Sequence, residues 1–143
     1  MKQGLAWPTE LERQEDGSIL VSFPDVPEAL TEGETRDAAL DQAQDCLVAA
    51  LGGYVKAQLP IPLPSPARRR TVIAVPALAA AKIALYAAMR ADGVSNTALA
   101  MRLGLSEGAV RRLIDLDHRS HIGQIETALH ALGQRLMIAA HAA

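Results

Sequence analysis

The stretch NTALAMRLGLSEGAVRRLID, residues 96–115, decides how the second half of this chain folds. Small Ala100 lets two helices approach closely, and Gly104 stands where a three-residue turn between them requires a positive φ. The hydroxyl of Ser106 can cap the second helix by accepting a hydrogen bond from an amide of its first turn. The pattern predicts a helix-turn-helix, with two packed helices of an all-α bundle as the alternative. Its buried faces are expected to come from Leu99, Leu103, Leu105, Val110 and Leu113.

Side chains at the start of the second helix of a helix-turn-helix face the base edges of DNA. Arginine can pair with guanine and glutamate can accept from cytosine, although spacing alone does not say which arginine reads a base. Asn96 and Arg119 stand where phosphate contact is expected. A twofold dimer places two such helices one turn of DNA apart, which predicts a palindromic operator. The candidate DNA-binding residues of the second helix are Ser106, Glu107, Gly108, Arg111 and Arg112.

The formal net charge of −2 conceals a strong asymmetry along the chain. Residues 1–66 carry four basic and eleven acidic side chains, which gives −7, whereas residues 67–143 carry ten basic and five acidic ones, which gives +5. A basic half suits phosphate, and an acidic half suits a cationic protein surface. We therefore expect two different partners, double-stranded DNA and a protein.

The remaining composition is typical of a cytoplasmic protein. Cys46 is the single cysteine, so no disulfide framework is possible, and we interpret it as a small buried hydrophobe in a reducing compartment. The sequence contains neither a signal-peptide pattern nor an uncharged apolar run of membrane-spanning length. Because domains of roughly 60 residues barely bury a stable core, a homodimer or a higher homo-oligomer is expected.

Alternating apolar residues predict a small antiparallel sheet at the start of the chain. Residues 3–13 form a candidate first strand that Pro8 places at an edge or a bulge. Asp16-Gly17 is a hairpin signal, and Ile19, Val21 and Phe23 alternate in a second strand. A short third strand is expected at 29–33.

A long helix is predicted over residues 36–57, with Thr35 as its N-cap. Asp37, Asp41 and Asp45 are spaced four apart on another face, either as a solvated surface or as a partner contact. The inward stripe is expected to consist of Leu40, Ala43, Leu47, Ala50, Leu51 and Tyr54.

Residues 59–66 alternate proline with apolar residues, which predicts an extended segment near a domain boundary. The β-rich run 71–75 could return to the first sheet as a fourth strand, and the Arg68-Arg69-Arg70 run between them is either solvated or in contact with phosphate. Helices follow at 76–93 and 121–132, and the apolar remnant 136–138 is a candidate dimer contact or a flap on the last helix.

The predicted fold class is therefore an α+β N-terminal domain followed by an all-α domain. Residues 1–75 hold the small antiparallel sheet and one long helix, and residues 76–143 hold the helix-turn-helix. An enzyme is not expected. The histidines, at positions 118, 121, 130 and 141, lack the spacing of a zinc site, and Asp16 and Asp25 do not form the strand-embedded carboxylate set of a two-metal nuclease. No metal or cofactor is predicted.

Motifs along nearly the whole chain resemble the HicB antitoxin family. They include Val21-Ser22-Phe23-Pro24-Asp25-Val26-Pro27, then Thr31-Glu32-Gly33-Glu34-Thr35 before the long helix. Leu103-Gly104-Leu105-Ser106 and Asp117-His118-Arg119-Ser120 are similar to the branch of that family with a helix-turn-helix. The resemblance implies a partial RNase H-like domain, without nuclease activity, that masks a small cationic HicA-like mRNA-cleaving toxin. It also implies that the C-terminal domain represses the operon.

Three hypotheses follow for the function of the chain. The first is an antitoxin that also binds its operator, with candidate toxin-binding residues in the acidic half of the chain. The second is a ligand-responsive helix-turn-helix repressor without a toxin partner, and the third is an RNase H-type enzyme that depends on Asp25. The candidate toxin-binding residues are Phe23, Asp25, Glu32, Glu34, Asp37 and Asp41.

Overall fold

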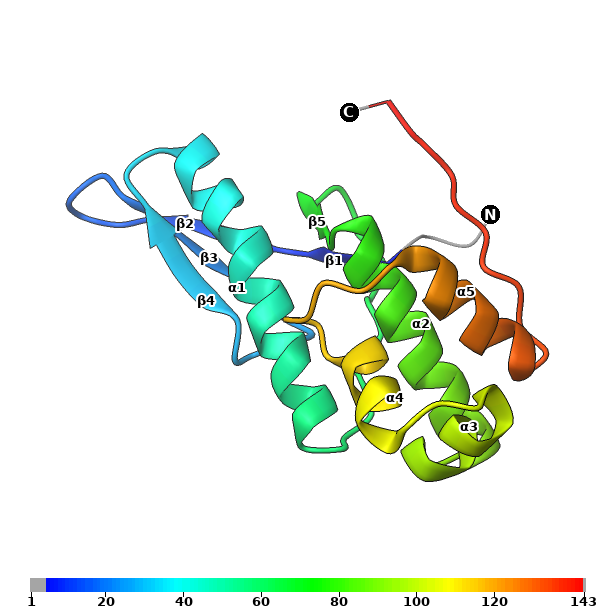
Figure 1. The fold of residues 1–143 in the computed structure, drawn as a ribbon. Helices are drawn as coiled ribbons and strands as arrows, with labels where there is room; N and C mark the ends of the chain where they lie inside the picture. Colours follow the sequence, from blue (N-terminus) through cyan, green and yellow to red (C-terminus); the bar gives the residue numbers. More distant parts are fainter. Residues whose placement is uncertain (1–4, 143) are drawn as a thin grey trace. The chain divides into compact units, whose positions relative to one another are not determined.

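The computed structural model describes residues 5–142, which form two compact units (Figure 1). The first unit ends at Ala80 and the second begins at Ala81, so the division lies within helix α2 (Ala77–Asp92). The boundary predicted from the sequence lies five residues earlier, next to Pro76. The first unit combines strands with one long helix, and the second is helical.

The strands of the first unit form two antiparallel sheets. β2 (Glu10–Arg13), β3 (Ile19–Ser22) and β4 (Leu30–Gly33) make a three-stranded sheet, and β1 (Ala6–Pro8) pairs with β5 (Val72–Ala74). The chain thus does return to its first strand after the proline-rich segment, but β5 forms a separate two-stranded sheet with β1 instead of a fourth strand in one sheet.

The first predicted strand, residues 3–13, is divided at Thr9, and its residues 3 and 4 lie outside the described residues. Both the amide and the hydroxyl of Thr9 donate to the carbonyl of Thr71, at 2.8 and 2.7 Å. Pro8 has no amide to give to a strand partner, so the ladder changes partner at this point. The two sheets are therefore joined through one buried threonine.

The Asp16-Gly17 hairpin is confirmed. Gly17 has a φ of 88°, and the Asp16 carboxylate accepts hydrogen bonds from the amide and the hydroxyl of Ser18 at 2.9 and 2.6 Å. These bonds lower the pKa of Asp16 because they favour the charged carboxylate.

Helix α1 (Arg36–Lys56) begins at the predicted cap, where the Thr35 hydroxyl accepts from the Ala38 amide at 3.1 Å. It lies across β4 and β3 (Figure 1). The predicted inward stripe was partly wrong, because Leu40, Ala50 and Tyr54 are only half-buried. The residues actually buried are Ala39, Ala43, Leu47, Leu51, Gly52 and Val55.

A close contact between strand and helix explains the difference at the start of α1. Gly33, at the end of β4, is buried against the first turn of α1, and a Cβ atom there would lie 2.5 Å from the Ala39 amide nitrogen. The strand backbone therefore reaches the helix backbone directly, which turns Ala39 rather than Leu40 inward. Cys46 is half-buried, with its thiol 3.6 Å from the Leu30 carbonyl, instead of fully buried as predicted.

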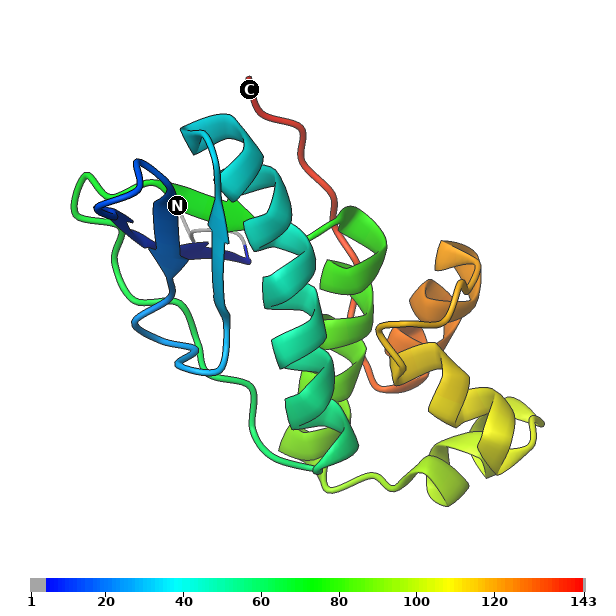
Figure 2. The ribbon, with the colours of Figure 1, turned by 90° about the vertical axis from the view of Figure 1, so that its left-hand side faces the viewer.

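The proline-rich segment 59–66 is extended and belongs to the first unit (Figure 2). The indole N–H of Trp7, which is fully buried, donates to the Pro62 carbonyl at 2.9 Å. The Asp25 carboxylate accepts from both the amide and the hydroxyl of Ser65, at 2.9 and 2.8 Å. These bonds fix the segment at two points, so it is not a free linker.

The second unit contains the rest of α2 with α3 (Asn96–Leu103), α4 (Glu107–Ile114) and α5 (Ile122–Ala131). Helix α3 contacts both α4 and α5. Leu105, which was predicted to be buried, is 45 % exposed because it lies in the turn between α3 and α4. Ile122, the first residue of α5, is 40 % exposed. The core of this unit contains Leu85, Leu99, Ala100, Val110, Leu113, Ile125, Ala128 and Leu129.

We expect Gly33→Ala to destabilise the protein, because its new methyl group would overlap the α1 backbone, which cannot yield as a side chain does. Overpacking of this kind costs about 1–3 kcal/mol. Gly53→Ala is the matched control: it lies within α1, where an added Cβ atom would meet nothing within 4 Å, and it should stabilise by roughly 0.5–1 kcal/mol. Urea unfolding of both variants measures the difference, and an equal effect of the two substitutions would contradict the close approach at Gly33.

Candidate functional site

Helices α3 and α4 form a capped pair joined by a short turn. Ser95 and Ser106 each accept a hydrogen bond from the third amide that follows, at 3.1 Å. Gly104 ends α3 with a φ of 67°, and the next amide donates to the Ala100 carbonyl at 2.9 Å. A residue other than glycine would be strained at this φ, so the predicted turn and the predicted cap of the second helix are confirmed.

The polar residues predicted at the start of α4 meet those at the start of α3. The Asn96 amide donates to Glu107 Oε1 at 3.3 Å, and Glu107 Oε2 lies 3.8 Å from Arg111 Nη2. The latter pair is exposed and contributes little stability, so these contacts can exchange for contacts with a ligand. One carboxylate thus links the first turns of both helices.

Gly108 leaves the first turn of α4 bare. A Cβ atom there would lie 3.6 Å from Arg112 Nη1 and 3.7 Å from Arg111 Nη2, so both guanidinium groups lie beside this turn. Exposed Ser106 and Glu107 complete the surface. The positive end of the helix dipole and two arginines therefore occupy one region, which suits an anionic ligand.

The other face of α4 is buried in the second unit. Val110 is 0 % exposed, and Leu113 and Ile114 are also buried. The side chain of Arg111 is 69 % exposed, and Arg112 is exposed as well. Arg119 is exposed in the loop after α4. The helix thus presents a basic face while its apolar face holds it to the protein.

Lys82, to which no role was assigned from the sequence, holds the far end of α4. Its side chain is 0 % exposed, and its ammonium donates to the Arg112 carbonyl at 2.7 Å and to the Ser120 hydroxyl at 2.8 Å. The last carbonyls of a helix lack partners within the helix and carry partial negative charge, so a buried cation is stabilised there. Lys82 thereby joins α2 to the end of α4 and to the loop that follows it.

Burial lowers the pKa of Lys82 below its ordinary value of 10.5, and the nearby Asp115 carboxylate partly opposes this shift. A signal for this residue was present in the sequence. Lys82 lies four residues after Leu78 and three before Leu85, a spacing that places it on the same face of the helix as these two leucines. A lysine in that position has to be paired by polar groups from elsewhere in the fold.

The predicted toxin-binding residues have different environments in the first unit. Phe23 is 1 % exposed and packs in the core, and Asp25 is held by its two bonds to Ser65. Both therefore have structural roles here. The remaining acidic candidates are exposed on β4, on the turn after it and on α1: Glu32, Glu34, Asp37 and Asp41.

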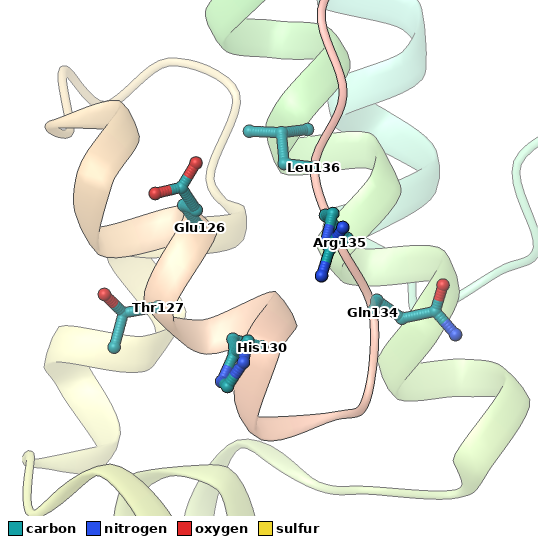
Figure 3. A pocket seen from close by; sticks show the side chains of 6 residues that line it. All are labelled: Glu126, Thr127, His130, Gln134, Arg135 and Leu136. Carbon is teal, nitrogen blue, oxygen red and sulfur yellow. The ribbon is translucent and has the colours of Figure 1, made fainter.

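A pocket of about 430 Å³ lies between α5 and the tail that follows it (Figure 3). Leu136 is half-buried in this region, whereas Met137 and Ile138 beyond it are 84 % and 69 % exposed. The residues that line the pocket are Glu126, Thr127, His130, Gln134, Arg135 and Leu136.

Within residues 5–142, no group of three His, Cys, Asp or Glu side chains is arranged to hold a metal ion. No helix in this part of the chain has the length and apolarity needed to cross a membrane.

Comparison with known proteins identifies similar chains. Residues 6–84 match the protein family described as HicB-like antitoxin of bacterial toxin–antitoxin systems. Antitoxin HicB 2 of Photorhabdus laumondii is 40 % identical over 140 residues, which cover 98 % of this chain and 99 % of that protein. Antitoxin HicB of Pseudomonas fluorescens is 38 % identical over 132 residues, 91 % of this chain and 90 % of that protein. Antitoxin HicB of Escherichia coli K12 is 36 % identical over 135 residues, 94 % and 98 % of the two chains. These relatives are named antitoxins rather than enzymes, in agreement with the expectation that this chain is not an enzyme.

The buried ammonium of Lys82 should make stability depend on pH in the alkaline range. With its pKa lowered in the folded state, Lys82 loses its proton on folding between that pKa and 10.5, so the free energy of unfolding rises with pH across this window. Lys82→Met lacks this titration. Urea unfolding of both proteins from pH 7 to 10.5 should show the wild type gaining stability relative to the variant, and parallel profiles would contradict the burial of the charge.

Proposed function

The chain belongs to the HicB-like family of bacterial antitoxins, and from this membership we propose that it neutralises a HicA-like mRNA-cleaving toxin and represses its own operon. The first unit, a partial RNase H-like domain in this proposal, covers the toxin. The second unit acts as a helix-turn-helix domain on operator DNA. Family membership supports the antitoxin role, and the basic outer face of α4 is the observation that carries the role in DNA binding.

The toxin-binding part of the proposal rests on charge and exposure. The first 66 residues have a formal charge of −7, which suits a cationic ribonuclease. Glu32, Glu34, Asp37 and Asp41 are exposed near the end of β4 and the start of α1. We infer that this acidic surface, with Asp45 one turn further along α1, contacts the toxin.

The DNA-binding part rests on α4 and its surroundings. Arg111 and Arg112 are exposed beside Gly108, while Val110 and Leu113 hold the opposite face of the helix in the core. In this proposal α4 enters the major groove, and Asn96 and Arg119 contact phosphates on either side. The exposed Met137 and Ile138 support a homodimer, which would present two such helices to a palindromic site.

Arg111→Ala and Arg112→Ala are each expected to weaken operator binding about tenfold or more, since a good contact from arginine to a base contributes roughly 1–3 kcal/mol. Fluorescence anisotropy with a duplex from upstream of the gene measures the affinity. Arg135→Ala removes the same charge from the tail after α5 and should have a much smaller effect. Equal losses in all three variants would argue against reading by α4.

The double variant Asp37→Asn/Asp41→Asn should slow association with the toxin by about tenfold at low salt, because charges at an interface act mainly on the rate of encounter. Glu12→Gln/Glu15→Gln is a control of equal charge at the β2–β3 hairpin. Association rates and rescue of growth during toxin co-expression are the measurements. If wild-type protein does not rescue growth from the co-expressed HicA-like toxin, the ligand-responsive repressor becomes the better hypothesis.

A further inference from the structure

The turn formed by residues 67–70 has an unfavourable sequence for its backbone. The Arg70 amide donates to the Ala67 carbonyl at 2.9 Å, and the two central residues, Arg68 and Arg69, have φ values of 49° and 67°. Positive φ at both central positions is the arrangement of a type I′ turn, for which Asn-Gly is the preferred pair. Two arginines there are strained, because their Cβ atoms crowd the backbone in this region.

The surrounding structure holds the turn in this strained conformation. Arg70 Nε donates to the Ala67 carbonyl at 3.1 Å, and Nη2 donates to the Pro66 carbonyl at 2.9 Å. Arg70 Nη1 also pairs with Glu10 on β2 at 3.2 Å. The preceding residue that anchors the segment, Ser65, is itself bonded to Asp25. Arg70 therefore has a structural role in holding the turn, and Arg68 and Arg69 do not share this role.

Arg68 and Arg69 are both exposed at this turn. Strained backbone that is held in place by its surroundings is typical of sites that bind a partner. The turn also brings two adjacent cations to a unit whose first 66 residues have a formal charge of −7. A cationic toxin would be repelled by this pair, so the charge points to a different, anionic partner.

Guanidinium groups bind phosphate through paired hydrogen bonds, and DNA is the polyanion to which the neighbouring unit is proposed to bind. We propose that Arg68 and Arg69 contact backbone phosphates of the DNA that flanks the operator. This inference rests on the proposed function of the second unit. The contact gives the acidic first unit one point of attraction to a duplex that would otherwise repel it, and it carries no sequence preference.

The decisive variant is Arg68→Asn/Arg69→Gly, which removes both charges and supplies the residues that the turn prefers. Relief of strain should raise its Tm by several degrees, so a loss of binding could not be attributed to unfolding. The logarithm of the binding constant falls as the logarithm of the salt concentration rises, and each lost phosphate contact makes this dependence shallower by about 1. The magnitude of the slope should therefore decrease by about 2 in the variant. The loss of affinity should be similar for operator and scrambled duplexes, since backbone contacts do not read sequence.

Two control variants separate local contact from general electrostatics. Arg68→Lys/Arg69→Lys keeps both charges and should therefore keep the salt dependence of DNA binding close to that of wild type. Arg13→Gln removes an exposed cation from β2 of the same unit and should leave the slope close to that of wild type. Full-length protein is titrated with duplexes that extend beyond the operator on both sides.

The proposal would be overturned if the salt dependence of DNA binding were unchanged in Arg68→Asn/Arg69→Gly. It would also be overturned if Arg13→Gln made that dependence shallower by as much. The proposed function would stand in either case, provided that the wild-type protein binds the operator. Weaker toxin neutralisation or altered self-association with unchanged DNA binding would overturn it in favour of a protein partner. Failure of the wild-type chain to bind any operator duplex would overturn both this inference and the proposed repression.

Discussion

The buried ammonium of Lys82 is the interaction on which the arrangement of the second unit depends. It is the point where α2, the last carbonyls of α4 and the loop at Ser120 meet. A charge without solvent is costly unless polar groups surround it, so the three segments are held together by the need to satisfy one cation. The exposed face of α4 is fixed as a result, because the helix is bonded at one end and packed along its apolar side.

The first unit is organised by the close approach of a strand to a helix and by hydrogen bonds to the proline-rich segment, rather than by a buried charge. Gly33 brings the end of β4 against the backbone of α1, where Ala39 is buried. Trp7 and Asp25 hold the proline-rich segment through Pro62 and Ser65. The acidic candidates that remain exposed lie at the start of α1 and the end of β4, whereas the one carboxylate of the Phe23-Pro24-Asp25 motif is used internally.

Features set by neighbouring residues could be predicted from the sequence, and features set by distant contacts could not. Thr35, Gly104 and Ser106 were identified because caps and positive-φ turns are decided within a few residues. Lys82 was missed because its partners lie 30 and 38 residues away. Ala43, Leu47 and Leu51 on the inward face of α1 were predicted correctly from the periodicity of the helix. The start of that face was misjudged because the packing of Gly33 against the helix backbone places Ala39 rather than Leu40 inward. The exposure of Leu105 follows from its place in the turn, where apolar character does not ensure burial.

The pairing of β1 with β5 has a consequence for synthesis of the chain on the ribosome. Thr9 and Thr71, which join the two sheets, are 62 residues apart, so almost the entire first unit must leave the exit tunnel before its ends can meet. Long-range pairing of this kind is slow, and it leaves the edge of β1 open in the nascent polypeptide until β5 arrives. During that interval the backbone N–H and C=O groups along β1 have no strand partner, and the first unit cannot complete its core.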